Sequence, residues 1–183
     1  MADIVITEFI SLDGVVEDPG GAEGFVHGGW TFPYWNDEIA AFKLDETLRA
    51  DALLLGRVTY EGFAAAWPGR TDEQGFADKM NAMPKYVVSA TLVDPEWSNT
   101  TVVALDEVAS LKERHEGDVL VAGSASLARA LVEDGLADEL RLLVYPVALG
   151  TGKRLFGEGG KQDLRLARSE AYSSGVVNLT YRR

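Results

Sequence analysis

The sequence contains no cysteine, so it can form neither disulfides nor thiolate metal sites, and it has no cysteine nucleophile. Its two histidines, His27 and His115, lie in separate segments, which argues against a histidine-based zinc site. We therefore expect no metal cofactor. The absence of cysteine also suits a reducing compartment, so we expect a cytoplasmic protein.

Positive charge is scarce as well. Lysine and arginine number 17 against 29 aspartates and glutamates, which gives a net charge of −12. That balance disfavours the basic surface that binds nucleic acid or an anionic membrane. No apolar run reaches the roughly 18 residues that cross a bilayer, and the N-terminus is acidic where a secretion signal would be basic. We expect a soluble protein whose partner is a small molecule.

The chain of 183 residues is long enough for one compact domain and short for two. Hydrophobic residues make up 46% and charged residues 25%, which is ordinary for a globular protein. The sequence holds no internal repeat, low-complexity tract or linker. We expect residues 1–183 to form a single domain.

Apolar, β-branched segments alternate with segments of helical periodicity. The expected strands cover residues 4–10, 52–55, 86–89, 101–104, 119–121 and 140–147, followed by an antiparallel hairpin of 164–172 and 176–181. The expected helices cover about 37–49, 58–66, 106–116 and 125–134. This order predicts an α/β fold of three layers, with a mixed, mainly parallel sheet, helices on both faces and an antiparallel C-terminal hairpin.

Three helix starts carry residues that favour capping. Asn36 is expected to cap the first helix, Asp106 the third and Ser124 the fourth. The buried face of the first helix is expected to consist of Ile39, Phe42 and Leu48.

Familiar catalytic and nucleotide-binding motifs are missing from the sequence. It has no G-x-G-x-x-G turn, no G-x-S-x-G elbow and no H-E-x-x-H helix. A P-loop fails at Gly152-Lys153, because Arg154 stands where serine or threonine is required.

What remains lies at the ends of expected strands, where open sheets bind ligands. Gly123 and Ser124 lead from a strand into a helix whose free N–H groups suit a pyrophosphate, or they form a simple serine cap. At a similar junction after Gly56, Arg57 could hold a phosphate or pair with a surface acid.

Residues 14–34 form a long stretch rich in glycine and aromatic residues, either a functional loop or a variable surface excursion. The aromatic residues could cover a flat substrate, pin the loop to the core or form a dimer contact. These residues are Trp30, Phe32, Tyr34 and Trp35. Just before this stretch, Asp13 is either a turn residue or an acid at a reacting centre.

Four segments, in this order, resemble the dihydrofolate-reductase-like superfamily. They are most similar to the riboflavin-biosynthesis reductase domain, which is the C-terminal domain of a bifunctional deaminase-reductase, and to its stand-alone relatives. The segments are 11–14 (SLDG), 50–61 (ADALLLGRVTYE), 119–124 (VLVAGS) and 135–140 (GLADEL), the last running into Pro146, Gly150 and Gly152. The resemblance covers nearly the whole chain and implies a dihydrofolate-reductase-like fold that binds NADPH without a G-x-G-x-x-G turn.

The resemblance also implies a set of cofactor-binding residues. Phosphate groups would be held by Gly56, Arg57 and Thr59, and the adenosine end of the cofactor by Ser89 and Thr91. The pyrophosphate would be received by Gly123, Ser124 and Ala125. The nicotinamide would face the backbone near Ile10 and Gly14. Lys85 is a further expected helper for the extra phosphate of NADPH.

These observations favour an NADPH-dependent reductase of a small flat heterocycle, either a pyrimidine such as 5-amino-6-(5-phosphoribosylamino)uracil or a pterin related to dihydrofolate. Asp13 is the expected acid at the reacting centre. The expected substrate contacts are Trp30, Phe32, Trp35 and a carboxylate at Asp37 or Glu38. Relatives are often dimers, and the C-terminal strands could supply a homodimer interface.

Two departures from the riboflavin-type pattern keep other functions open. Residues 122–124 read Ala-Gly-Ser where that pattern has Glu-Gly-Gly, and the segment after Gly14 is aromatic. The alternative hypothesis is a catalytically silent nucleotide-binding or regulatory module with the same fold. A partner-binding protein without a nucleotide site is the third.

Overall fold

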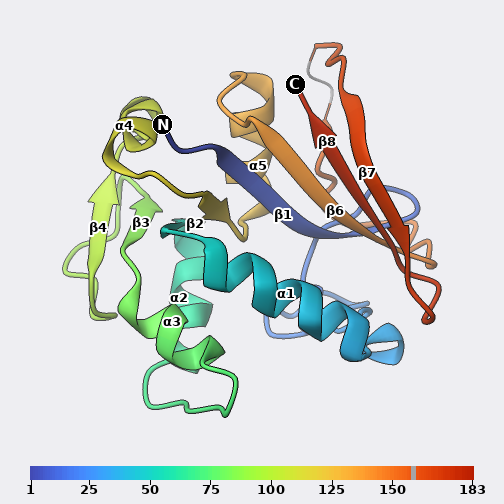
Figure 1. Ribbon diagram of the computed structural model, residues 1–183. Coiled ribbons are helices and arrows are strands. Elements are labelled where there is room, and N and C mark those ends of the chain that lie inside the picture. Colours follow the sequence, from blue (N-terminus) through green and yellow to red (C-terminus); the bar gives the residue numbers. More distant parts are fainter. Residues whose placement is uncertain (158–159) are drawn as a thin grey trace.

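The computed structural model describes residues 1–157 and 160–183 and is built on one eight-stranded sheet (Figure 1). The order of the strands is β4-β3-β2-β5-β1-β6-β8-β7. The strands are β1 (Ile4–Ser11), β2 (Ala52–Gly56), β3 (Lys85–Val88), β4 (Thr100–Val103), β5 (Val119–Val121), β6 (Glu139–Tyr145), β7 (Arg165–Ala171) and β8 (Val177–Arg182). The α-helices are α1 (Asp37–Arg49), α2 (Arg57–Ala66), α3 (Phe76–Ala82), α4 (Leu111–Arg114) and α5 (Ala125–Glu133).

The six strands from β4 to β6 run parallel, and β8 and β7 complete the sheet as an antiparallel hairpin. This arrangement confirms the predicted mixed sheet with its C-terminal hairpin. None of the helices in the described parts of the chain has the length and apolar character that crossing a membrane requires.

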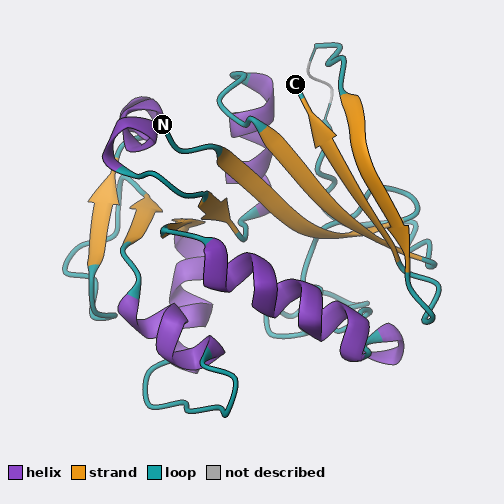
Figure 2. Ribbon diagram, in the orientation of Figure 1, coloured by secondary structure: helices purple, strands orange, loops and turns teal. Residues whose placement is uncertain are grey.

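Strand β1 lies near the middle of the sheet and its residues alternate between two covered faces. Ile4 and Ile6 belong to a core with Leu131 of α5, whereas Val5 belongs to a separate core with Tyr60 of α2. Figure 2 shows α5 behind the sheet and α1, α2 and α3 in front of it. The result is the three-layer arrangement that the alternation of strands and helices predicted.

The neighbours of β1 have different lengths, and this creates the feature that matters most for function. The pairing of β1 with β5 ends at Ile6 and Val121, but its pairing with β6 continues to Ser11 and Tyr145. Within residues 1–157 and 160–183, the last five residues of β1, from Thr7 onward, therefore have a strand partner on one side only. We call this part of the sheet, Thr7–Ser11 of β1 facing the chain after Val121, the fork.

Helix α1 confirms its predicted bounds and cap, but only part of its predicted buried face. Asn36 Oδ1 accepts a hydrogen bond from Ile39 N at 3.0 Å, and Ile39 is buried. Leu48 is 45% exposed, so its predicted burial is wrong. Glu46 is buried instead, because its carboxylate accepts a hydrogen bond from Thr7 Oγ1 at 2.9 Å and lies 3.7 Å from Arg141 Nη1.

The predicted helix over 106–116 is broken. A 3-10 turn, Leu105–Ser110, precedes the short α4, and Asp106 lies in the first turn of that segment and not at its cap. The side chain of Glu107 accepts a hydrogen bond from Ala104 N at 2.7 Å, while Ser110 Oγ donates to Glu107 O at 2.7 Å. These local bonds favour the tighter helical turn.

Helix α3 was not predicted, because a helix of seven residues is too short for its hydrophobic periodicity to be detected. Asp72 organises its start. The carboxylate of this residue accepts hydrogen bonds from Gln74 N, Phe76 N and Ala77 N at 2.9, 3.0 and 2.5 Å.

Candidate functional site

Two loops that follow β2 and β5 meet at the carboxyl edge of the sheet. Gly56 N donates to Gly123 O at 3.1 Å. A Cβ atom built on Gly56 would lie 2.2 Å from Ser124 Oγ and 3.1 Å from Ser124 N, so no side chain fits there without moving the loops apart. We call residues 56–59 and 123–125 the glycine junction.

The second glycine of the junction is constrained in a different way. Gly123 has a φ of +108°, which side chains rarely adopt, and a Cβ atom there would lie 2.9 Å from Thr59 Oγ1. The peptide bond between Gly123 and Ser124 is cis. The fold thus brings together five residues that the resemblance implied for cofactor binding: Gly56, Thr59, Gly123, Ser124 and Ala125.

The junction is also where two helices begin. Gly56 and Ser124 occupy the N-cap positions of α2 and α5, and neither caps its helix through a side chain. Ser124 Oγ lies 3.0 Å from Ser126 Oγ instead, so the predicted serine cap is absent. Two helix N-termini with free N–H groups therefore meet at one backbone contact, and such a site suits a group with several negative oxygens, such as a pyrophosphate.

The two basic residues expected near the junction differ. Arg57 is exposed at the start of α2, and its Nη1 lies 2.8 Å from Glu61 Oε1. Lys85 is fully buried, where its Nζ donates to Asn81 O and Met83 O and lies 4.4 Å from the ring centre of Trp97. The expectation for Lys85 is wrong, because its buried ammonium group is already committed to hydrogen bonds with Asn81 O and Met83 O. Burial lowers the pKa of Lys85 to about 8.

Ser89 and Thr91 follow β3 on the same edge of the sheet. The register pairs Gly56 with Val88, so Ser89 follows β3 at the level where Arg57 follows β2. Its Oγ accepts hydrogen bonds from Thr91 N at 3.1 Å and Leu92 N at 3.0 Å, which forms a compact turn beside β2.

The fork leaves backbone groups of β1 without a strand partner. Val119 N donates to Asp3 O, so the backbone groups of Asp3 point toward β5. Alternate residues of a strand direct their backbone groups to the same side, so Phe9 also directs its N–H and C=O to that side, into the fork. Ile10 directs the same groups to β6. Past the fork, Ser11 N donates to Val15 O at 2.9 Å. Among the described residues, the N–H and C=O of Phe9 are thus the donor and acceptor that find no partner in the fork, one residue from the expected position at Ile10.

Asp13 is held by several donors. Its Oδ1 accepts hydrogen bonds from Ser11 Oγ at 2.6 Å and Leu149 N at 3.0 Å, and its Oδ2 accepts one from Gly150 N at 2.8 Å. These bonds hold the pKa of Asp13 well below its usual range, so the carboxylate is ionised at neutral pH. The geometry favours the turn role, because the side chain joins the end of β1 to the turn at 149–150 and has no proton to give.

A second acid, Glu8, was missed by sequence reasoning. It is buried in β1, and burial raises its pKa to about 8; Lys43 lowers this pKa and Glu23 raises it further. Its Oε1 has no hydrogen-bond partner within the described residues. The available signal was a single charged residue in the middle of a mostly apolar strand, IVITEFIS.

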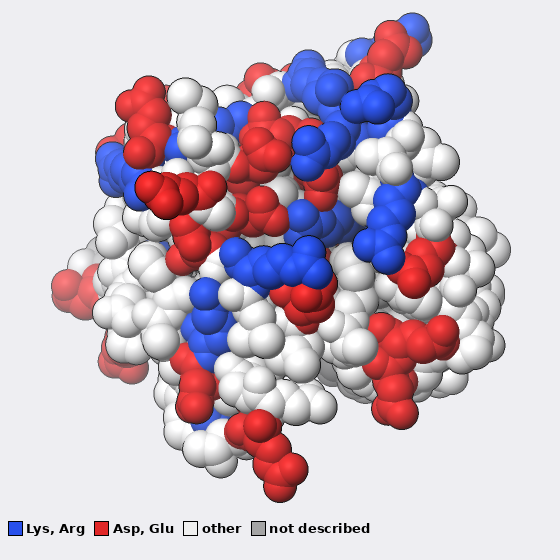
Figure 3. Space-filling view, in the orientation of Figure 1, with Lys and Arg blue, Asp and Glu red and all other residues white. Residues whose placement is uncertain are grey.

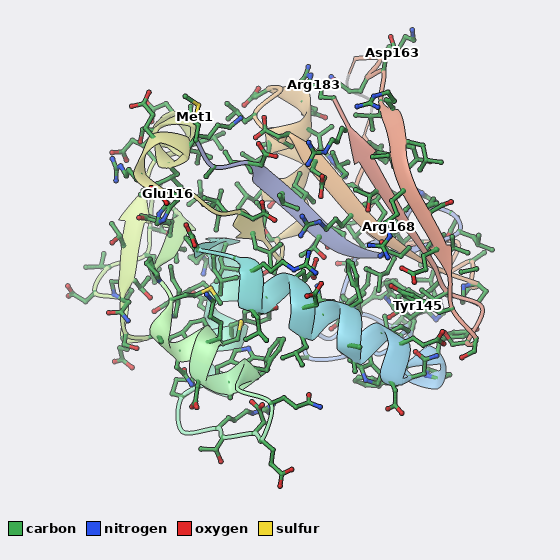
Figure 4. The ribbon with its side chains drawn as sticks, in the orientation of Figure 1. Met1, Glu116, Tyr145, Asp163, Arg168 and Arg183 are labelled. Atoms are coloured by element: carbon green, nitrogen blue, oxygen red, sulfur yellow. The ribbon has the colours of Figure 1, made fainter. Side chains whose placement is uncertain are left out.

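The aromatic residues of the 14–34 loop divide into two groups. Trp30 is 7% exposed, donates from Nε1 to Glu17 O at 2.9 Å and packs edge-on against Tyr145, which Figure 4 labels. Trp30 therefore pins the loop to the core, one of the roles left open for this cluster. Phe32 and Trp35 are 64% and 47% exposed, and only these two have much ring surface available to a ligand.

The surroundings of the exposed aromatics include both a ring and charge. Trp35 packs edge-on against Phe9 with ring centres 6.0 Å apart, and Lys43 Nζ lies 5.2 Å from the Phe9 ring centre. Asp37 is exposed at the first position of α1. Glu38 instead accepts a hydrogen bond from Ser173 N at 2.8 Å. Acidic and basic side chains lie interspersed on the face shown in Figure 3.

Comparison with known proteins extends this picture. Residues 2–178 match the family model of the RibD C-terminal domain. The chain is also 31% identical over 186 residues to the uncharacterized protein YyaP of Bacillus subtilis (strain 168), covering 97% of this chain and 93% of YyaP.

Three solved structures share the fold. A Shewanella sp. PV-4 protein, named as a candidate riboflavin biosynthesis protein, has a TM-score of 0.77 at 22% identity, covering 100% of this chain and 99% of its own. A pyrimidine reductase-like protein from Corynebacterium diphtheriae has a TM-score of 0.65 at 13% identity, covering 99% and 91%. RibD from Acinetobacter baumannii has a TM-score of 0.66 at 15% identity, and this chain spans 58% of its length.

Proposed function

Because this chain belongs to the RibD C-terminal domain family, we propose that it is an NADPH-dependent reductase of a small flat heterocycle of the pyrimidine type. The glycine junction is the observation that carries the proposal. Two uncapped helix N-termini meet there, at a place where glycine alone fits, and this is a suitable seat for the pyrophosphate of a dinucleotide.

The extra phosphate of NADPH needs a partner of its own, since the chain as a whole carries a charge of −12. Arg57 is the proposed partner because it directly follows Gly56 and is exposed. Its present contact with Glu61 is an exposed ion pair of the kind that contributes little stability, so a phosphate can replace it. The hydroxyl of Thr59 is a second donor.

The ring of the cofactor is proposed to lie in the fork. A carboxamide needs one hydrogen-bond donor and one acceptor, and the N–H and C=O of Phe9, which have no partner in the described part of the chain, offer both. When bound there, reduced nicotinamide supplies the hydride. The chain's own contribution is to hold that ring in place and to keep the nearby turn in one conformation through Asp13, which we assign to positioning and not to proton transfer.

The substrate is proposed to lie against the exposed aromatic rings. Phe32 and Trp35 both expose ring surface, and Trp35 packs against Phe9 of the fork. A flat heterocycle gains most from stacking on such rings. Asp37, exposed on the first turn of α1, remains the proposed carboxylate for the polar edge of the substrate.

The test is to titrate NADPH into the purified protein and then to follow its oxidation with a panel of pyrimidines and pterins. We expect saturable binding and substrate-dependent oxidation. Gly123→Val serves as the comparison protein, because its side chain would collide with Thr59 and its φ is unfavourable; circular dichroism must show that it folds. Binding without oxidation by any substrate would favour the silent module. Absence of both binding and an NADPH-induced thermal shift would overturn the proposal.

A further inference from the structure

The strand register brings Glu8 to the level of the glycine junction. It lies two residues past the Ile6–Val121 pair on β1, just as Gly123 lies two residues past that pair on the β5 side. Strand alternation puts Glu8 on the same face as Ile6 and Ile10, both of which belong to the core that α5 covers. Glu8 is thus the first residue of that face to lack a β5 neighbour, on the face of the sheet that α5 covers.

The surroundings of Glu8 keep its carboxyl group uncharged at neutral pH. The residue is 8% exposed, and its Oε1 is enclosed without a hydrogen-bond partner among the described residues. Two charged groups reach it from the elements packed around it, Lys43 of α1 and Glu23 of the 14–34 loop, and their effects oppose each other. Burial dominates and raises the pKa of Glu8 to about 8.

An uncharged carboxyl group at this position has a consequence for an anionic ligand. A carboxylate beside the glycine junction would repel the phosphates of a dinucleotide, and partial burial strengthens that repulsion. A protonated carboxyl group removes the repulsion and offers an O–H donor to a carbonyl oxygen. The same coupling acts in both directions, so a ligand that prefers the protonated form must also stabilise it.

We propose that Glu8 is a binding residue of the dinucleotide site, and that the site accepts the dinucleotide when this carboxyl group is protonated. The ligand in this inference rests on the proposed function. Above neutral pH, binding joins one proton from solvent to the Glu8 carboxylate and one dinucleotide to the site. No bond of the dinucleotide is broken, so the effect is independent of any substrate.

The experiment is calorimetric titration of NADPH into the full-length protein, in pairs of buffers with different ionisation enthalpies. Measurements between about pH 7.5 and 9.5 avoid the phosphate ionisation near pH 6. We expect proton uptake to rise toward one per NADPH bound across this range, and affinity to fall by up to about tenfold per pH unit above the pKa of about 8.

Two variants test whether Glu8 is responsible. Glu8→Gln stays neutral at every pH, so we expect it to bind NADPH without the proton uptake and with an affinity that does not fall over this range. Glu133→Gln makes the same chemical change at an exposed site at the far end of α5, and we expect it to behave as wild type.

The outcomes separate this inference from the proposed function. Proton uptake that persists unchanged in Glu8→Gln, or its absence from wild type that binds NADPH, would overturn the role of Glu8 alone. A wild-type protein that binds no NADPH at any pH would overturn both the role of Glu8 and the proposed function.

Discussion

The glycine junction and the end of β1 lie at the same edge of the sheet, but different properties determine what each can bind. At the junction, Gly56 and Gly123 allow two loops to approach closely, and shape decides what fits. At the end of β1, two acids five positions apart in the sequence hold opposite protonation states. Glu8 is buried, its Oε1 meets no hydrogen-bond donor within the described residues and its pKa is raised, whereas Asp13 accepts three hydrogen bonds and its pKa is lowered.

The comparison shows that residue type alone does not determine what a side chain can do at this edge of the sheet. Burial disfavours the charged form of a carboxyl group, and hydrogen-bond donors favour it. The junction should therefore respond to changes of volume, and the end of β1 to isosteric changes of charge. Four predictions follow this division.

The largest effect is expected from adding one methyl group to the junction. In Gly56→Ala the new Cβ atom would lie 2.2 Å from Ser124 Oγ and 3.1 Å from Ser124 N, so the two loops must separate. Because a backbone pyrophosphate site depends on their spacing, we expect NADPH affinity to fall by at least about 100-fold, or about 2.7 kcal/mol. Fluorescence titration of NADPH measures this loss.

Two further proteins make the volume argument specific. Gly62→Ala adds the same methyl group within α2, where a Cβ atom meets nothing within 4 Å, and its affinity should match wild type. The double variant Gly56→Ala/Ser124→Gly removes the side chain that collides, so it should regain part of the lost affinity. If the double variant binds no better than Gly56→Ala, steric contact with Ser124 is not the cause.

The second prediction concerns stability and the buried acid. The pKa of Glu8 is about 8 in the folded protein against an ordinary value of 4.5, so the unfolded chain releases this proton first. Folding is therefore penalised progressively as pH rises from about 4.5 to 8, and the penalty is constant above that range. The free energy of unfolding of Glu8→Gln should therefore rise relative to that of wild type between pH 5 and pH 8.5, by an amount on the order of a few kcal/mol.

Urea unfolding of both proteins at the two pH values measures this difference, with Glu133→Gln as the exposed control. A stability difference between Glu8→Gln and wild type that is the same at pH 5 and pH 8.5 would show that Glu8 ionises normally. The contrast between Glu8 and Asp13 would then disappear.

The sequence predicted most of the fold because its strands are short, apolar and bounded by turn residues. The strand from Ala52 to Gly56 is apolar throughout, as a central parallel strand must be. The failures are local. Helix α3 depends on one carboxylate, Asp72, that organises its start, and the 106–116 segment is divided by side-chain bonds that helical periodicity does not report.

The candidate site was predictable where glycine marks a close backbone approach, as at Gly56 and Gly123. It was less predictable where the property depends on surroundings. Glu8 and Asp13 are both acids near the end of one strand, and only their burial and hydrogen bonds distinguish them. Lys85 was misplaced for the same reason, because no feature of its sequence position shows that its ammonium group is enclosed.

The third prediction tests whether charge contributes at the junction in addition to shape. We expect Arg57→Ala to weaken NADPH binding about tenfold, and NADH binding much less. A charge-assisted hydrogen bond contributes about 1.5–3 kcal/mol. Because Arg57 is exposed to solvent, we expect a contribution near the low end, about 1.4 kcal/mol, which corresponds to a tenfold change in affinity. Titration of both cofactors at two salt concentrations measures the ratio, which should shrink as salt rises.

Glu61→Gln provides the matched control, because it removes the competing partner of Arg57 and should strengthen NADPH binding slightly. Equal losses for both cofactors in Arg57→Ala would assign this residue to the shared pyrophosphate. No loss for either would make it a surface ion pair only.

The smallest effect on turnover is expected from Asp13→Asn. The amide has a single acceptor oxygen, so it cannot serve Leu149 N and Gly150 N from two oxygens as the carboxylate does. We expect a lower melting temperature, but a change in turnover per folded molecule far below the ~100-fold loss that removal of a general acid or base causes. Thermal unfolding and steady-state rates, normalised to folded protein, separate the two effects.

The pH dependence of this variant completes the contrast with Glu8. The lowered pKa of Asp13 means that its carboxylate stabilises the fold above the unfolded pKa of about 3.8, and that this stabilisation is lost as pH falls through the lower folded value. The stability gap between wild type and Asp13→Asn should therefore be widest near neutral pH and close under strong acid, whereas the gap for Glu8→Gln opens as pH rises from about 4.5 to 8. A ~100-fold loss of turnover with an unchanged melting temperature would instead place Asp13 in the chemistry.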